Sequence, residues 1–490
     1  MKYIKHVKKP AIASLLVGLL TVPGMASAAN YYVHAGVGKN TNSGTQPTAA
    51  FADLAYAMPK LRAGDTLHVR AGKYTATPAG GKLSNGTQTS PITVKPYLSE
   101  KPVISFTSKL TLSNNRAWWV FDNLTFQNSQ LIAIGASSDT GGCSFATDIA
   151  IINSRFQHSS YQGINLQCGK RILVAGNIFD NMRARVAGTD VHAIVLSDQT
   201  EDVFIGLNTF RDIGADGIQL GRGSNNRNVN IVDNTFEVIR PYVYRDLNGQ
   251  PTADTQRFGN VGENGIDIKA GPGPINVTGN TIRGFRPAAS GQDVSGSMGV
   301  GLVIQQMSSG INVSKNRFID SNFHMRIVGD GAPTSLPNRD VDVTNNIFDE
   351  VPAYTGSGQV PTGLDVVNVT GVRVYNNVFY NLKSAGKRLL RLQDVREVSL
   401  QNNLFHNGTV LQPPATYVMD VYADHNAWSK IGGAIPSDWK GLRDLTLTDP
   451  AIDWTNWKPK AGSPMIDKGM NVELPDDYYG VPITGVAPEI

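Results

Sequence analysis

One aromatic or apolar position recurs along most of the chain, at intervals that are typical of a stacked coil. Aligned on that position, eleven units carry Phe126, Phe156, Phe179, Phe210, Phe236, Ile282, Phe318, Phe348, Phe379, Phe405 and Trp428. Most successive members lie 23 to 31 residues apart, which is shorter than the roughly 34-residue period of helical hairpin repeats. Within the units, segments such as 229–232 and 341–343 alternate apolar and polar residues, as half-buried strands do. The pattern predicts an all-β chain folded as a right-handed parallel β-helix.

Asparagine stands two residues before the recurring apolar position in nine of the eleven units: Asn177, Asn208, Asn234, Asn280, Asn316, Asn346, Asn377, Asn403 and Asn426. We expect each phenylalanine to stack on the next one inside the coil. An asparagine at a tight turn tolerates left-handed backbone, and its amide can bond the coils on both sides. These asparagines are therefore predicted to be structural.

The repeat starts and stops at positions that divide the chain into four segments. Lysines followed by the apolar run 11–22 and by Ala26-Ser27-Ala28 are typical of a signal peptide that is cleaved after Ala28. A stacked coil leaves open apolar ends, which need caps. The predicted segments are a signal peptide at 1–28, an N-terminal cap with the first strands at 29–91, the β-helix at 92–430 and a C-terminal capping tail at 431–490. We expect a secreted or periplasmic monomer that neither spans nor binds a membrane.

Composition and charge narrow the range of functions. Charged residues make up 17% of the chain and glycine contributes 50 residues, which argues against disorder and coiled coils. The formal net charge is +4, and no run of Lys or Arg lies outside the first ten residues, so nucleic-acid binding has little support. The two cysteines, Cys143 and Cys168, lie about one repeat apart, where stacked coils could join them in a disulfide.

Polar residues gather on two neighbouring strands when the units are aligned by their inward apolar pairs. Strand side chains alternate and rungs lie about 4.8 Å apart, so outward residues of adjoining units share a patch. That patch is predicted to hold Gln219, Asp267 and Lys269, with Arg326 two rungs along. His192, Asp216 and Asn264 form the column just before these strands, with Asp190 and Glu263 close by.

This set of side chains suits proton abstraction next to a carboxylate. Removing the C5 proton of a uronic acid places negative charge on its carboxylate, so a catalyst needs a cation there and a base at C5. Oxygen ligands from Asp, Glu and Asn suit Ca²⁺. Lys269 beside a bound cation could act as the base, and Arg326, which stays protonated, could clamp a carboxylate or act as the acid.

Two long intervals, after Phe236 and after Ile282, place extra residues in loops beside this patch. Insertions on one face of a solenoid commonly mark its binding face. Tyr242 or Tyr244 from the first loop is expected to protonate the leaving oxygen. The residues expected to contact substrate are Gln219, Tyr242, Tyr244, Arg245, Gln305 and His324.

The segment Ala215-Asp216-Gly217-Ile218, followed one long coil later by Glu263-Asn264-Gly265-Ile266-Asp267, resembles the calcium site of polysaccharide lyase family 9. Pectate lyases of that family carry an Ala-Asp-Gly-aromatic rung and then an Asp-Asp-Gly-Trp-Asp rung. The resemblance implies that Asp216, Glu263, Asn264 and Asp267 bind Ca²⁺. The Tyr31–Thr66 region and the Ser-Pro-x-Ile-Asp tail also look like those of secreted β-helix lyases and epimerases.

The sequence departs from that family at the base. Aligning the next rung places Val303 where the family has its lysine, and Lys269 is the nearest substitute. Lys269 with Arg326 is similar instead to polysaccharide lyase family 6, in which a Lys and an Arg act as base and acid beside Ca²⁺. The resemblance implies a lyase that cleaves an acidic polysaccharide by Ca²⁺-assisted β-elimination.

Several alternatives stay open at this point. A polyuronate C5-epimerase shares the proton abstraction, a non-catalytic glycan-binding protein could use the same fold, and a hydrolase could use paired carboxylates. Asp216 and Asn264 each precede glycine, which is also an ordinary turn signal. Asp267 and Lys269 could equally form a solvated ion pair.

Overall fold

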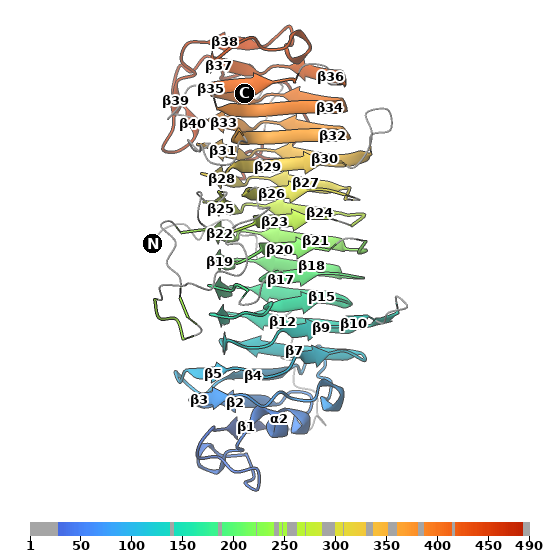
Figure 1. The fold of residues 1–490 in the computed structure, drawn as a ribbon, viewed down its shortest axis with the longest axis vertical. Coiled ribbons are helices and arrows are strands. Elements are labelled where there is room, and N and C mark those ends of the chain that lie inside the picture. Colours follow the sequence, from blue (N-terminus) through green and yellow to red (C-terminus); the bar gives the residue numbers. More distant parts are fainter. Residues whose placement is uncertain are drawn as a thin grey trace.

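The chain folds into a long stack of coils, each built from short parallel strands (Figure 1). The computed structural model describes residues 28–137, 142–184, 189–221, 223–239, 245–246, 248–251, 262–269, 271–286, 299–306, 308–329, 337–350, 360–380, 387–413 and 417–483. Residues 1–27, which hold all but the last residue of the predicted signal peptide, lie outside this set. No helix in the described part of the chain is long and apolar enough to cross a membrane.

Three ladders of parallel strands run along the stack. The first contains β20 (Asp216–Leu220), β23 (Asn264–Ile268), β26 (Val300–Ile304), β29 (Phe323–Val328), β32 (Thr362–Tyr375) and β34 (Arg388–Gln401). The second contains β21 (Arg227–Val232), β24 (Ile275–Thr278), β27 (Ile311–Ser314), β30 (Asn338–Thr344), the later halves of β32 and β34, and β36 (Val418–Asp424). The third begins upstream with β13 (Arg155–Gln157), β16 (Ile178–Asp180), β19 (Thr209–Arg211) and β22 (Thr235–Glu237). The predicted parallel β-helix is confirmed.

Aromatic rings fill the inside of the coil and stack from rung to rung. Phe179 and Phe210 have ring centroids 5.0 Å apart with planes tilted by 5°, and Phe210 and Phe236 lie 4.5 Å apart. The same stack continues from Phe318 through Phe405 to Trp428. Offset-stacked rings at this spacing add to the free energy already gained by burying apolar surface.

Each asparagine of the predicted ladder joins the coils on both sides, as expected. The Nδ2 of Asn208 donates to the Val174 carbonyl at 2.9 Å and to Asn234 Oδ1 at 3.0 Å, and its Oδ1 accepts from the Asn177 backbone N–H at 2.9 Å. The left-handed backbone, however, falls on the residue before each of these asparagines, such as Leu207 with φ 58°. The preceding residue makes the turn, which leaves the asparagine side chain to point into the coil.

The two ends of the stack have different structures. At the N-terminal end, β1 (Asn30–Val33) pairs with β2 (Thr66–Val69), and β2 pairs with β4 (Ile92–Pro96), so the ladder begins well before residue 92. The short helix α2 (Leu54–Ala57) lies beside these strands and is N-capped by the Asp53 carboxylate (Figure 1). At the other end, β38 (Leu445–Leu447) adds a rung to β37 (Ala427–Ile431), and the tail beyond it packs back along the coil.

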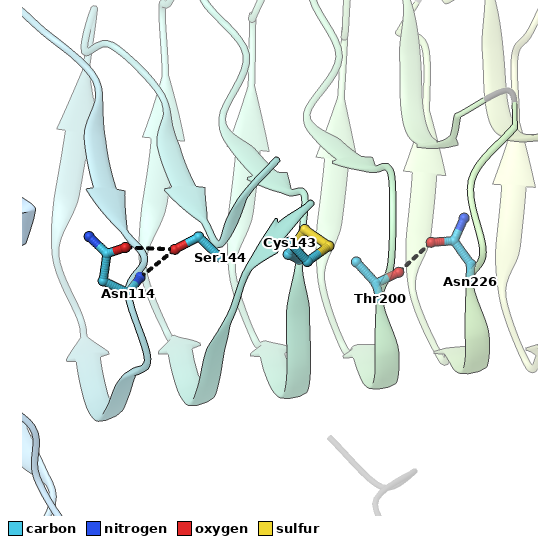
Figure 2. Close-up of a disulfide and its surroundings, with 6 residues drawn as sticks. Asn114, Cys143, Ser144, Thr200 and Asn226 are labelled. Carbon is cyan, nitrogen blue, oxygen red and sulfur yellow. Dashed lines mark hydrogen bonds between the residues drawn. A yellow bond between two sulfur atoms is a disulfide. The ribbon is translucent and has the colours of Figure 1, made fainter. Parts of the chain in front are cut away.

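A disulfide joins Cys143 to Cys168, as predicted from their spacing, with Cα atoms 5.7 Å apart. It lies on an edge of the coil where other side chains also link successive rungs: Asn114 with Ser144, and Thr200 with Asn226 (Figure 2). Cross-linking two coils lowers the entropy of the unfolded chain and so stabilises their register.

One histidine lies inside the ring stack. His324 is 0% exposed, and its ring lies 6.5 Å from the Phe318 ring and 6.3 Å from the Phe348 ring, measured between centroids. Burial lowers the pKa of His324 to about 3, against a smaller raising effect of the Glu350 backbone. The unfolded chain, in which the pKa returns to about 6.5, therefore binds a proton that the folded chain rejects between these two pH values.

We predict that the free energy of unfolding decreases as the pH falls from 6.5 toward 3. His324→Leu is expected to remove the part of this decrease that the histidine causes. At pH 5 the histidine contributes about 2 kcal/mol of destabilisation by this linkage. Urea unfolding of wild type and variant at pH 7 and pH 5 measures it. If the difference in unfolding free energy between the two proteins is the same at pH 7 and pH 5, His324 is not held neutral by burial.

Candidate functional site

The candidate site lies on β20 and β23, two adjoining strands of the first ladder. Their register pairs Asp216 with Asn264 and Gln219 with Asp267, as the alignment of apolar pairs predicts. Ile218 and Ile266 are buried in the core, so the intervening Gln219 and Asp267 face outward. The register therefore brings the predicted polar residues together one rung apart.

Glycine follows Asp216 and Asn264 because the strand passes close to the ring stack. A Cβ atom on Gly217 would lie 2.6 Å from the Gly265 carbonyl oxygen and 2.7 Å from the Phe236 ring. Both glycines belong to strands and neither has a left-handed backbone. The reading of these Asx-Gly pairs as turns is thus wrong, and the glycines serve close packing.

Asp216 is buried at the centre of a hydrogen-bond network. Its Oδ1 accepts from Asn264 Nδ2 at 2.8 Å, and its Oδ2 accepts from Gln219 Nε2 at 2.8 Å. His192 Nδ1 lies 3.2 Å from the same Oδ2 and 3.1 Å from the Asp216 backbone nitrogen. Burial lowers the pKa of His192, but Asp216, Asp190 and Glu263 raise it by more, so its net pKa is above the ordinary value.

Asp267 forms the second half of the cluster and binds the predicted base. Lys269 Nζ lies 2.9 Å from Asp267 Oδ2, and Gln305 Nε2 donates to Asp267 Oδ1 at 2.8 Å. Burial, reinforced by the nearby charge of Asp216, raises the pKa of Asp267 to about 6. Burial lowers the pKa of Lys269, but Asp267, Asp216 and Glu263 raise it by more, so this arrangement favours the charged ammonium.

Glu263 adds a third carboxyl group beside Asp216. Burial raises its pKa to about 7, and the charges of Asp216 and Asp190 act in the same direction. For both Glu263 and Asp267, burial is the largest cause of the raised pKa and the charge of Asp216 adds to it, whereas Lys269 acts in the opposite direction. A cation placed beside these carboxyl groups would favour their charged forms.

The residues fit Ca²⁺ by donor chemistry but not by their present arrangement. Asp216, Glu263, Asn264 and Asp267 offer carboxylate and amide oxygens, which Ca²⁺ prefers. Among the described residues, no three His, Cys, Asp or Glu side chains converge into a metal-binding group. Both oxygens of Asp216 and of Asp267 are engaged with side-chain nitrogens, so a bound ion would have to displace Lys269 or an amide N–H.

A basic cluster continues the same outward column down the coil. The register runs from Asp267 through Val303, Arg326 and Asp365 to Arg391. Asp365 is buried and accepts from Arg326 Nε at 2.8 Å and from Arg391 Nε at 2.5 Å. The column itself contained this signal, although Asp365 and Arg391 were not among the predicted site residues.

His324 does not belong to the site, and its prediction as a substrate contact is wrong. The register of β26 and β29 places it level with Gly301, in the column of glycines that face the ring stack. Its side chain therefore points into the core, where no substrate reaches it.

Arg245 lies over a different ladder. It lines a cavity of about 350 Å³ with Arg155, Asp180 and Arg211 of the third ladder, and its guanidinium donates to the Gly249 carbonyl at 2.9 Å. This placement argues against a contact shared with the Asp216 cluster. Tyr242 and Tyr244 lie outside the described residues, so their predicted role stays a prediction.

Comparisons with known proteins concern the fold. A family model described as "Right handed beta helix region" matches residues 109–242, and comparison with curated protein sequences gives no match. A solved structure described as XylC with xylose is 14% identical, with a TM-score of 0.52 over 94% of this chain and 98% of that one. The alginate lyase AlyGC of polysaccharide lyase family 6 is 15% identical, with a TM-score of 0.51 over 80% of this chain and 52% of that one. The chain therefore has the right-handed parallel β-helix fold, which it shares with XylC and with an alginate lyase.

Proposed function

We propose that this protein is an exported lyase that cleaves a uronate-containing polysaccharide by β-elimination. The observation that carries the proposal is the cluster in which Asp216, Asp267 and Lys269 meet on two adjoining rungs. A single ammonium beside these carboxyl groups, in line with Arg326 and Arg391 further along the coil, suits a substrate whose reacting carbon lies beside a carboxylate. Export would follow from the predicted signal peptide at residues 1–28.

In the proposed reaction Lys269 is the base. Its neutral amine takes the C5 proton of the sugar, the electron pair forms a C4–C5 double bond, and the C4–O bond breaks. The leaving oxygen takes a proton, for which Tyr242 or Tyr244 is the proposed donor. Because Asp267 holds Lys269 as an ammonium, this contact has to weaken before the amine can act as a base.

Ca²⁺ is the proposed cofactor, held by Asp216, Glu263, Asn264 and Asp267. It would supply positive charge for the sugar carboxylate, which becomes more negative as the C5 proton leaves. Asn264 in place of a carboxylate lowers the charge of the ligand set, so we expect weaker binding than a site of four acids provides.

Arg326 is the proposed carboxylate clamp. Asp365 holds its guanidinium at 2.8 Å, and the ring of Phe323 lies 4.9 Å from its central carbon. A fixed guanidinium binds a carboxylate at a lower cost in side-chain entropy than a mobile one. Gln219 and Gln305, which donate to Asp216 and Asp267, are the proposed neutral contacts beside the reacting sugar.

A non-catalytic glycan-binding protein is the second candidate, because one observation favours it. Asp267 fixes Lys269 as an ammonium, and Val303 stands on the next rung, so no described residue there offers a free amine. Such a protein would retain acidic polysaccharides without turning them over.

We predict that incubation with uronate polysaccharides raises the ultraviolet absorbance, because elimination creates unsaturated uronate ends. Lys269→Ala is expected to lower the rate by about 10²-fold or more, since a positioned base contributes on that order. The matched control is Lys170→Ala, which removes a surface lysine paired with Glu201 at 3.1 Å. Intact polymer across a uronate panel with Ca²⁺ present would contradict the lyase. An altered epimer ratio without shortening, seen by proton NMR, would identify an epimerase instead.

We predict that Ca²⁺ raises the melting temperature of the protein and that chelator reverses the shift. Asp216→Asn should reduce the shift, and Asn264→Asp should increase it, because the first removes and the second adds a ligand charge. Asp148→Asn, which alters a carboxylate paired with Arg171 at 2.7 Å away from the cluster, is the control. Equal shifts in all four proteins would place Ca²⁺ elsewhere, and no shift in any would exclude it from the mechanism.

A further inference from the structure

The C-terminal tail crosses the outside of the coil between two anchors. At the first, Asn402 Nδ2 donates to the Met470 carbonyl at 2.7 Å and Asn402 Oδ1 accepts from the Met470 N–H at 2.9 Å. At the second, Asn345 Nδ2 donates to the Asp476 carbonyl at 2.9 Å, and the Asp476 carboxylate pairs with Lys315 at 2.7 Å. Residues 471–474 between these anchors form one wall of a groove of about 680 Å³, a volume typical of ligand sites.

The floor of this groove is the outer face of the second ladder, and it consists of amides, hydroxyls and one Asp-Arg pair in register. One column contains Asn276, Asn312, Asp342 and Arg373, and its neighbour contains Thr278, Ser314, Thr344, Tyr375 and Gln401. The columns repeat every rung, about 4.8 Å apart. The groove therefore offers a periodic polar surface along the axis of the coil.

The asparagines of the floor are held in place yet keep hydrogen-bonding capacity. Asn312 Nδ2 donates to Asn276 Oδ1 at 2.9 Å, and Asn276 Nδ2 donates to Asn230 Oδ1 at 2.9 Å. A carboxamide has two N–H groups and two acceptor positions, so this chain uses one of each at Asn276. Among the described contacts, the other N–H and the other acceptor position are left for a ligand that both donates and accepts, as a sugar hydroxyl does.

Charge on the groove disfavours an anionic polymer. Arg373 pairs with Asp340 at 2.7 Å and also with Asp342, and Glu473 adds a carboxylate from the tail wall. The carboxylates thus outnumber the one guanidinium that lines the groove. Tyr375 lines the groove, and Tyr422, which is 53% exposed, lies beyond its lining, two rungs from Arg373 in the same column. An aromatic side chain at each place supplies apolar surface of the kind on which a sugar ring packs.

We propose that this groove binds a neutral polysaccharide, at a site on a different ladder from the Asp216 cluster. An extended chain of neutral sugars would lie along the coil axis, with its hydroxyls on the amide column and its rings against Tyr375 and Tyr422. Such a site would hold the protein on a matrix of neutral polymer while the Asp216 cluster faces away from it.

Isothermal titration of the Lys269→Ala protein with neutral β-linked hexasaccharides of glucose, xylose and mannose tests the proposal. At least one is expected to bind saturably, and Asn312→Ala and Tyr375→Ala should each weaken that binding about tenfold, the effect of losing a well-placed hydrogen bond or ring contact. Asn230→Ala is the matched control, because Asn230 belongs to the same amide chain but does not line the groove. Tyr422→Ala gives a fourth variant on an exposed side chain, should another variant fold poorly.

Absence of saturable binding for all three sugars would overturn the proposal, as would binding that the groove variants leave unchanged. If a uronate hexasaccharide binds more tightly than the neutral sugars, and Asn312→Ala weakens that binding, the groove binds an acidic sugar and the proposal of a neutral ligand is wrong. Because Lys269 is already replaced in the titrated protein, none of these results depends on lyase activity.

Discussion

The fixed register between neighbouring coils is the constraint on which the rest of the structure depends. Phenylalanine rings stack at 4.4 to 5.1 Å where the column is aromatic, and each ladder asparagine bonds the coil before it and the coil after it. A slip of one residue would turn every inward side chain outward and leave the buried amides without partners. The outer faces inherit this register, so residues far apart in sequence form straight columns on the surface.

The outward column of the first ladder and the groove on the second ladder are both consequences of that register. On the first ladder it aligns Gln219, Asp267, Val303, Arg326, Asp365 and Arg391, so an acidic cluster gives way to a basic one. On the second ladder the register aligns amides and hydroxyls with one Asp342-Arg373 pair, so this face has little net charge. The same coil thus carries two faces of different chemistry, for which we propose an anionic sugar on the first ladder and a neutral sugar on the second.

The candidate site balances two demands on Lys269. Its contact with Asp267 compensates part of the carboxylate charge on two buried rungs, and that contact keeps the ammonium protonated. A base has to be neutral, so the proposed elimination requires another cation to replace Lys269 as the partner of Asp267. The proposed role of Ca²⁺ answers this need, since an ion among Asp216, Glu263 and Asp267 would compete with the ammonium for the same oxygens.

The sequence predicted the columns well because strand alternation and repeat spacing decide them. The spacing of the apolar pairs alone places Asp216 beside Asn264 and Gln219 beside Asp267, and the register of the two strands confirms both pairs. The prediction failed where the chain departs from plain alternation. His324 was expected to face outward, but it lies in the glycine column, where the backbone turns the side chain inward onto the rings. The left-handed residue was misplaced by one position, because composition alone does not separate two neighbouring turn residues.

Arg245 shows a second limit, since the sequence reveals that a loop is long but not which ladder it covers. The contact between Arg326 and Asp365 follows from their adjacent places in the outward column. The contact between Lys269 and Asp267 depends on the side-chain conformations, which the sequence does not give. We propose that the acidic sugar lies across the Asp267 and Val303 rungs, with its carboxylate toward Arg326. A crystal structure of the Lys269→Ala protein with a uronate hexasaccharide would locate the sugar. We expect a sugar ring above these two rungs, and a ligand bound only on the second or third ladder would rule this placement out.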